Sequence, residues 1–243
     1  MKAILKHVDE LHLSERAAML ALLDRHFHGV CEEVFRADLG EKTHALLLWN
    51  DDGELCGFST LRFCVEFFEG RRDSLLVSGD TIVDPGSWGA NILSRAWIEA
   101  VLRLHREMGE GDLWWLLLTS GFRTYRLLTG YWLDFLPRFD RASDPERLRR
   151  RDHFARALYG DRFDPVRGVV VFPRPQMLRG TLAGIPPGRL RDPHVAFFQT
   201  QNPGHPRGDE LVCLARLGED NLTPAGRRVV DHIRREPVLS RDE

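Results

Sequence analysis

The segment from Ser74 to Leu104 joins features that together could bind a phosphate-bearing ligand. Its sequence, SLLVSGDTIVDPGSWGANILSRAWIEAVLRL, passes from an apolar strand pattern through a turn at Pro85-Gly86 into a helix pattern without a spacer. The first turn of a helix leaves about four backbone N–H groups unpaired and carries the positive end of the helix dipole. The segment therefore predicts a site for a phosphate group at the start of the helix.

Motifs for other kinds of chemistry do not fit this sequence. The stretch GDTIVDPGSWGANI lacks the Gly-Lys-Ser/Thr of a Walker loop and the three glycines of a dinucleotide fingerprint. The serines lack the G-x-S-x-G context of a hydrolase elbow. Among ten histidines His26 and His28 are the closest pair, and we predict no metal site.

The elements that must position the segment are clear over the first two thirds of the chain. Helices are predicted near 14–28, 87–108 and 121–130. Two strand patterns flank the turn at Asn50–Gly53, and a third covers 74–84. The continuous apolar run DLWWLLLTS, 112–120, predicts a strand buried on both faces, and YWLDFLPR, 131–138, predicts a further strand.

The pattern changes from about residue 138. A helix is signalled by Ser143, Pro145 and Glu146, and another by the Thr-Pro start of TPAGRRVVDHIRRE. Strand-like runs occur in RGVVVFPRP and in HVAFFQTQNPGHPRGDELVCLARL. The stretch 140–195 is open to three interpretations: a lid, an insertion or a partner-facing arm.

Composition limits the partners and the location of the protein. The 34 basic and 36 acidic side chains nearly cancel, so no global field favours nucleic acid or an anionic membrane. The four cysteines lack CxxC spacing and are expected to be reduced core thiols. The first twenty residues do not read as a leader, and no apolar run approaches the ~20 residues that span a bilayer. We expect a cytoplasmic protein without a membrane span.

The order of these elements, with Val83-Asp84-Pro85, Gly89 and a long helix, resembles the GNAT acyltransferase superfamily over roughly 14–137. In that family a V-x-P segment precedes a Gly-rich loop whose amides hold the pyrophosphate of coenzyme A. A short helix there carries a tyrosine shortly before a Gly-aromatic pair, as Tyr125 precedes Gly130-Tyr131 here.

The resemblance implies an α/β (α+β) fold with a mixed, mostly antiparallel sheet flanked by helices. Residues 1–137 would form the acyl-donor-binding core. Residues 138–243 would form a C-terminal extension that completes the sheet and carries the lid, insertion or arm.

The resemblance also implies how the acyl donor is held. Backbone N–H groups of the splayed strand and the turn would bind it, through Thr81, Ile82, Val83, Ser87, Trp88, Gly89, Ala90 and Asn91. Ser120, at the end of the next strand, would hydrogen-bond pantetheine, or else cap the next helix at Gly121. The family loop reads Q/R-x-x-G-x-G/A, whereas Trp88, Asn91 and Leu93 stand where a basic and two small residues are expected. A bulky tryptophan would narrow or reshape the phosphate cradle. Two donors therefore stay open, acyl-CoA and an acyl group on the phosphopantetheine of a carrier protein.

Acyl transfer from a thioester to an amine needs a deprotonated amine and a protonated leaving thiolate. Asp80, beside a predicted bulge at Gly79, is the candidate base or amine-orienting group, or else a strand-end carboxylate bonded to backbone. Tyr125 is the candidate acid for the thiolate, or else a core aromatic. Glu66 would face the acceptor pocket, or else the wet face of the sheet.

We therefore expect an N-acyltransferase that moves an acyl group from an acyl thioester to an amine of a small molecule. The altered loop favours an alternative, a non-catalytic GNAT-like binding or regulatory module. Acyl transfer to oxygen is a third reading. Arg71, Arg72, Arg95 and Arg103 are candidate docking charges for an acidic acyl carrier protein, and a homodimer is a further expected assembly.

Overall fold

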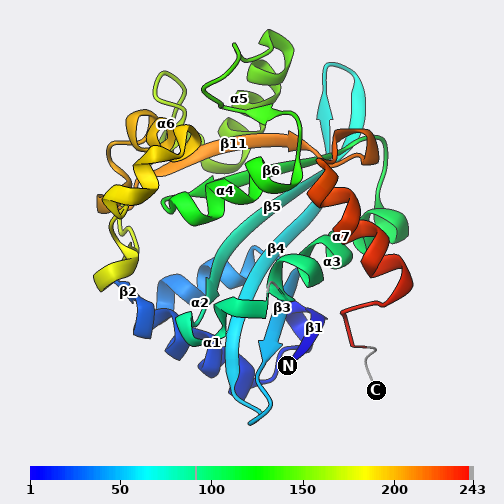
Figure 1. Ribbon diagram of the computed structural model, residues 1–243, viewed down its shortest axis with the longest axis vertical. Coiled ribbons are helices and arrows are strands. Elements are labelled where there is room, and N and C mark those ends of the chain that lie inside the picture. Colours follow the sequence, from blue (N-terminus) through cyan, green and yellow to red (C-terminus); the bar gives the residue numbers. More distant parts are fainter. Residues whose placement is uncertain (91, 241–243) are drawn as a thin grey trace.

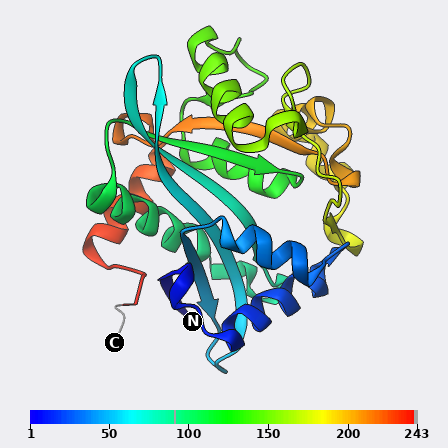
Figure 2. The ribbon, with the colours of Figure 1, turned by 180° about the vertical axis from the view of Figure 1, so that it is seen from behind.

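In the computed structural model, a nine-stranded sheet runs through the molecule and helices cover both of its faces (Figures 1 and 2). The structure describes residues 1–90 and 92–240, without the side chains of 88–90 and 181. The strand order is β1 (Lys2–His7), β3 (His44–Trp49), β4 (Leu55–Phe68), β5 (Arg71–Val83), β6 (Leu113–Thr119), β11 (Glu210–Arg216), β9 (Val169–Val170) and β8 (Phe163–Asp164). Neighbours along this order pair antiparallel except β5 and β6, which are parallel. The predicted mixed, mostly antiparallel sheet is confirmed.

The two faces of the sheet differ in how their apolar residues are grouped. On the front face, α3 (Ile92–Met108), α4 (Phe122–Tyr131), α6 (Pro193–Gln201) and α7 (Pro224–Arg235) pack on one cluster that includes Leu76, Leu117 and Cys213 (Figure 1). On the back face, α1 (Leu13–His26) and α2 (Glu32–Gly40) cover one cluster, and α5 (Pro145–Tyr159) covers a separate one around Val77 (Figure 2). The back face therefore has a strip between its helices that neither apolar cluster fills.

The predicted hairpin and most predicted helices are present. The Asn50 side chain closes the hairpin turn by accepting from the backbone N–H groups of Asp52 and Glu54, at 3.0 and 2.8 Å. β6 is buried along its whole length, as the apolar run predicted. Helix α7 begins as expected, because Thr223 accepts a hydrogen bond from the N–H of Gly226 and Pro224 occupies the first helical position.

Two predicted boundaries differ from the structure. The helix predicted at 87–108 is divided, because Pro85–Ala90 forms a 3-10 helix and α3 runs from Ile92 to Met108. The strand-like run HVAFFQTQ is α6, so that expectation was wrong. The Asp192 side chain accepts from the N–H of His194 and Pro193 stands at the first helical position, a start signal that outweighs strand propensity.

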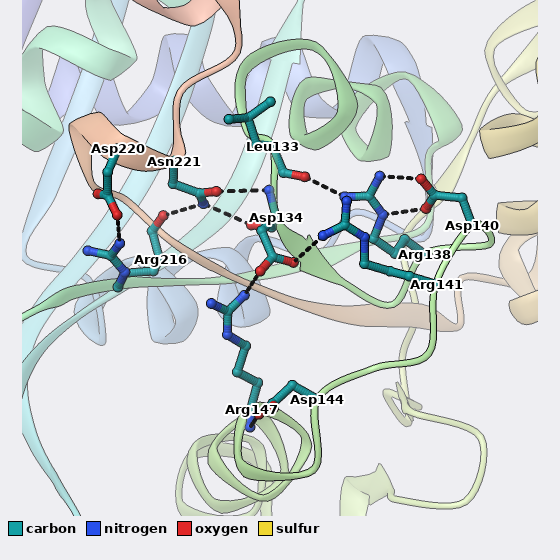
Figure 3. A network of polar contacts seen from close by, with 10 residues as sticks. All are labelled: Leu133, Asp134, Arg138, Asp140, Arg141, Asp144, Arg147, Arg216, Asp220 and Asn221. Carbon is teal, nitrogen blue, oxygen red and sulfur yellow. Dashed lines mark hydrogen bonds and ion pairs between the residues drawn. The ribbon is translucent and has the colours of Figure 1, made fainter.

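The strand predicted at 131–138 is much shorter than expected. The Asn221 side chain accepts from the backbone N–H of Asp134 and donates to the Asp134 carbonyl, both at 2.8 Å (Figure 3). The Asp134 carboxylate also pairs with Arg147 of α5. Pro137 has no N–H group to donate to a neighbouring strand. Of the described residues 131–138, only Phe135 and Leu136, which form β7, pair with β11. The network in Figure 3 thus joins the chain after α4 to the segment before α7.

The sequence pattern did not reveal several elements, including β8. β1 forms the outer edge of the sheet, and α2 lies beside α1. The strands β2 (Phe27–His28) and β10 (Met177–Leu178) form a small sheet of their own. Two-residue strands are too short to give a period-2 pattern, so sequence reasoning could not detect β2 or β10.

Candidate active site

The parallel strands β5 and β6 separate toward one end. They pair from Ser74 opposite Leu113 to Ser78 opposite Leu117. Beyond Ser78, β5 continues to Val83 along β4, and the described residues show no further pairing with β6. The predicted opening of the strand is therefore present: among the described residues, 79–82 of β5 lie beyond the last pair with β6.

A cavity of about 300 Å³ lies at this opening. Its walls come from the end of β5, the start of α3 and the start of α4, including Val83, Leu93 and Thr124. Leu178 and Leu182, from and just after β10, also line it. A smaller cavity of about 40 Å³ shares Thr81, Leu93, Ser94, Thr124 and Leu127 with it and reaches the indole rings of Trp97, Trp115 and Trp132. The front face thus offers a largely apolar space that begins where the strands part.

Four of the residues predicted to bind the acyl donor line the larger cavity, namely Thr81, Ile82, Val83 and Ser87. The Thr81 hydroxyl lies 2.7 Å from the Ser59 hydroxyl and donates to the Gly79 carbonyl at 3.2 Å. Ser120 lies between β6 and α4, where its backbone contacts His205, and its neighbour Gly121 lines the cavity.

The remaining predicted donor residues lie in the turn before α3. Trp88, Gly89 and Ala90 belong to the 3-10 helix Pro85–Ala90, whose backbone alone the structure describes there. Asn91 lies outside the described residues. Asp84, just before this turn, accepts from the N–H of Gly86 at 3.0 Å and lies 3.3 Å from both Arg25 and His26. The carboxylate of Asp84 thus ties the turn to the end of α1.

Tyr125 lies in the core. Its side chain is fully buried among aromatic rings that include Phe135 and Phe198, and its hydroxyl donates to the Pro137 carbonyl at 2.9 Å. Burial raises the pKa of this phenol above its ordinary value. Because the Tyr125 hydroxyl is buried and already donates its proton to the Pro137 carbonyl, it is not placed to protonate a departing thiolate.

Asp80 lies in the predicted bulge, which the structure confirms. Gly79 and Asp80 together oppose the single residue Thr60 of β4, because the register shifts between Ser59 and Leu61. A Cβ atom on Gly79 would lie 2.6 Å from both Thr60 Oγ1 and Lys42 Cε. The bulge therefore brings the backbone at Gly79 against the Thr60 and Lys42 side chains, and a larger residue at position 79 would require these side chains to move.

Asp80 belongs to a group of interacting charges on the back face. Burial raises the pKa of Asp80 to about 7, with Asp38 acting in the same direction and Lys42 opposing. Burial likewise raises the pKa of Glu210, the first residue of β11, to about 8, and Asp80 and Asp38 add to this rise. The Lys42 ammonium is 2.6 Å from the Asp38 carboxylate, so its positive charge is already paired.

These charges occupy the strip between the two apolar clusters of the back face, which we call the polar strip. We define it by Asp38, Lys42, Thr60, Arg62, Asp80 and Glu210. Asp80 and Glu210 both keep part of their surface exposed. Glu66 lies further along β4, beside Cys64 and partly exposed, with a Sγ–Oε1 distance of 3.8 Å.

Sequence reasoning missed Glu210, Lys42 and Thr60. Glu210 alternates with Val212 and Leu214 on one face of β11, which is a usable signal in hindsight. The sequence does not show that Glu210 lies on the same part of the sheet as Asp80, because this depends on β11 being the strand next to β6.

The candidate carrier-docking arginines are dispersed. Arg71 and Arg72 stand at the start of β5 and pair with Asp112 and Glu110, at the end of the strand away from the opening. Arg103 pairs with Glu107 within α3. Arg95, in the first turn of α3, has a buried Nε without a hydrogen-bond partner among the described residues.

The described residues contain no group of three His, Cys, Asp or Glu side chains placed to hold a metal ion. In the same part of the chain, no helix is long and apolar enough to cross a membrane. All four cysteines are free, and Cys56 and Cys213 are buried.

Comparison with known proteins gives structural similarities at low identity. No family model and no curated protein matches the chain. A conserved protein of unknown function from Enterococcus faecalis V583, described as a probable N-acyltransferase, is 18% identical with a TM-score of 0.41. That match covers 56% of this chain but 33% of the other, so it spans about a third of that protein.

Two further solved structures show the same level of similarity. A GNAT-family N-acetyltransferase from Escherichia coli, in complex with CoA, is 19% identical over 54% of this chain and 69% of its own, with a TM-score of 0.38. A ribosomal-protein-alanine N-acetyltransferase from Brucella melitensis biovar Abortus 2308 is 17% identical, with a TM-score of 0.41. That match covers 59% of this chain and 97% of the other. The observed sheet is mostly antiparallel, and its one parallel pair, β5 and β6, parts beside the start of α3, which is the arrangement that the resemblance to the GNAT superfamily predicted.

Proposed function

We propose that this protein is an N-acyltransferase that moves an acyl group from a pantetheine thioester to an amine of a small molecule. The observation that carries the proposal is the opening between β5 and β6. A cavity lies at it on the front face, and a carboxyl group with a raised pKa, Asp80, lies on the β5 bulge at the same level of the sheet. Donor and acceptor would meet in this gap.

The donor side follows from the backbone and the cavity. Residues 79–82 of β5, which do not pair with β6, would offer N–H and C=O groups to the amides of a pantetheine arm, as a neighbouring strand would. The turn before α3 would take the phosphates, because the first turn of α3 carries no acidic residue and the start of a helix has a positive electrostatic potential. Acyl-CoA and an acylated carrier protein share the pantetheine arm, so the experiment below separates them.

The chemistry follows from Asp80. Its carboxylate takes one proton from the acceptor ammonium, and the freed amine nitrogen attacks the thioester carbonyl carbon. The C–N bond forms, the C–S bond breaks, and the second nitrogen proton goes to the departing sulfur. A pKa near 7 suits this role, because the carboxylate is available at neutral pH and is basic enough to accept the proton.

Donor binding is the first test. We expect acyl-CoA at a hundred times its Kd to stabilise the native state by about 2.7 kcal/mol, which raises the melting temperature by several degrees. Acylated carrier protein is the second arm, and an adenine nucleotide without pantetheine is the negative ligand. Ser94→Trp, which fills both cavities, should remove the shift, whereas Ser14→Trp, on an exposed surface of α1, should keep it. No shift with either thioester would contradict the proposal.

The alternative is a GNAT-like binding module without catalysis. It is favoured by Tyr125, the expected acid, whose hydroxyl is buried and bonded to Pro137. Release of free thiol with a panel of amines distinguishes the two functions. Thioester binding without thiol release would support the binding module, and thiol release that depends on an amine would exclude it.

A further inference from the structure

The polar strip interrupts the helix layer of the back face. The α1–α2 cluster reaches the sheet at Phe58 and Ile82, and the α5 cluster reaches it at Val77 and Val212. Glu210 lies two residues before Val212 on β11, and Asp80 lies two residues before Ile82 on β5. Two carboxyl groups thus stand where the apolar covering stops, and both keep some surface exposed.

An unpartnered hydroxyl lies in the same strip. Thr60 is 1% exposed, and its Oγ1 has no hydrogen-bond partner among the described residues. The close approach of Gly79 to both Thr60 Oγ1 and Lys42 Cε places this hydroxyl beside the Lys42 stem and the bulge that carries Asp80. A buried hydroxyl without a partner costs free energy, which a ligand N–H group would recover.

The charges in the strip do not balance. Lys42 is paired with Asp38, and both contribute to the electrostatics of Asp80 and Glu210. From β4, Arg62 lies near Cys64 and Tyr159, and Tyr159 of α5 faces Glu210 and Asp38. Asp80 and Asp38 both raise the pKa of Glu210, and Lys42 opposes them, so the strip holds more negative than positive charge near Glu210.

We propose that Asp80 and Glu210 bind the acceptor, with Thr60 as a hydrogen-bonding partner, and that the acceptor is a small molecule with two ammonium groups. This inference rests on the proposed function. One ammonium gives its proton to Asp80 and reacts, and the other stays charged and pairs with Glu210. In this arrangement Glu210 determines specificity, because an acceptor with a carboxylate in place of its second ammonium would meet a like charge.

Binding measured without any donor tests the inference. The probes are 1,4-diaminobutane, 1-aminobutane and 4-aminobutanoate, which share a reacting amine and differ at the other end. By titration calorimetry at pH 8 we expect the diamine to bind at least ten-fold more tightly than the monoamine, and 4-aminobutanoate not to bind. Diamine affinity should rise between pH 6 and 8.5, as the two carboxyl groups lose their protons. Equal affinity for the diamine and the monoamine in the wild-type protein would overturn the inference.

Variants assign the effect to Glu210. Glu210→Gln should bind the diamine and the monoamine equally. Glu33→Gln, an exposed position on α2 that changes net charge by the same amount, should keep the ten-fold preference. A Glu210→Gln protein that still prefers the diamine would also overturn the inference. Since no thioester is present, a failure of acyl transfer leaves this result unchanged, and a failure here leaves donor binding unchanged.

Discussion

At the scale of single residues, the site depends on one bulge. An extra residue in β5 makes both Gly79 and Asp80 oppose Thr60, and this changes the direction of the strand where β6 leaves it. The glycine allows the close approach to Lys42, and the aspartate next to it becomes a desolvated carboxyl. A local irregularity therefore both opens the sheet and prepares the candidate base.

Substitution of Asp80 tests the role of the base. Asp80→Asn keeps the shape of the side chain but cannot take a proton, so we expect kcat for acyl transfer to fall by roughly 10²- to 10⁴-fold. The KM for the thioester should change little, because in the proposed mechanism Asp80 acts on the amine and not on the donor. Thiol release at saturating donor measures both constants. A loss in donor KM as large as the loss in kcat would contradict a role in proton transfer.

Sequence reasoning identified part of this site. Asp80 and the bulge could be predicted because a glycine inside a strand pattern marks an irregularity. Glu210 could not be paired with it, because the partner of β6 is a strand from the distant segment after α6. Tyr125 was chosen by its distance from Gly130-Tyr131, and that spacing does not reveal that the hydroxyl bonds the Pro137 carbonyl.

At the scale of elements, the candidate donor cavity is lined on one side by the segment around β10, which carries no long helix or strand. β10 pairs with β2, and Arg179 donates to the carbonyl of Phe27 at 2.6 Å, so the end of α1 holds this segment in place. Leu178 and Leu182 then face the cavity. The stretch 140–195 was open to several interpretations because its pairing uses two-residue strands, which leave no pattern in the sequence.

Removal of one side chain from this segment should weaken donor binding. We expect Leu182→Ala to raise the KM for acyl-CoA several-fold with kcat nearly unchanged, because the lost contact is equal in the ground and transition states. Steady-state kinetics measures this change, and a melting curve checks that the variant is folded. Leu13→Ala, at a side chain that is 86% exposed, is the control. A fall in kcat at constant KM would contradict the role of this segment as a wall of the donor cavity.

At the scale of the whole molecule, the raised carboxyl pKa values affect stability. Asp80 and Glu210 bind protons more tightly in the folded than in the unfolded chain, because their pKa values in the folded chain are raised to about 7 and about 8. Their contribution to stability therefore falls as the pH rises above the pKa values of the unfolded chain, and the fall ends once both groups have ionised in the folded chain. The pKa values of His44, His194 and His205 are lowered by burial and act oppositely, mainly below pH 6.5.

We therefore expect the free energy of unfolding to fall by about 1 kcal/mol between pH 7 and pH 9. Urea denaturation at constant ionic strength measures this difference. In Glu210→Gln the decrease should be clearly smaller, because the group with the higher pKa is gone. An equal decrease in the variant and the wild-type protein would show that other groups control the effect.

The sheet itself could be predicted only in part. Periodicity identified β3 to β6, and the run ELVCLAR read as a strand, but the order of strands within the sheet depends on tertiary packing. Sequence reasoning also had no means to place α5 and α2 on the same face with a gap between them. The candidate acceptor site lies in that gap.

One consequence follows from the pairing of Leu211 with Thr119. All residues of β6 are buried in the folded protein, and the edge of β6 that pairs with β11 stays unpaired until β11 has left the ribosome. During synthesis, a long apolar strand with free N–H and C=O groups would be exposed to other nascent chains. Chaperone capture of the growing chain should therefore be strongest while the stretch between α4 and β11 is being translated.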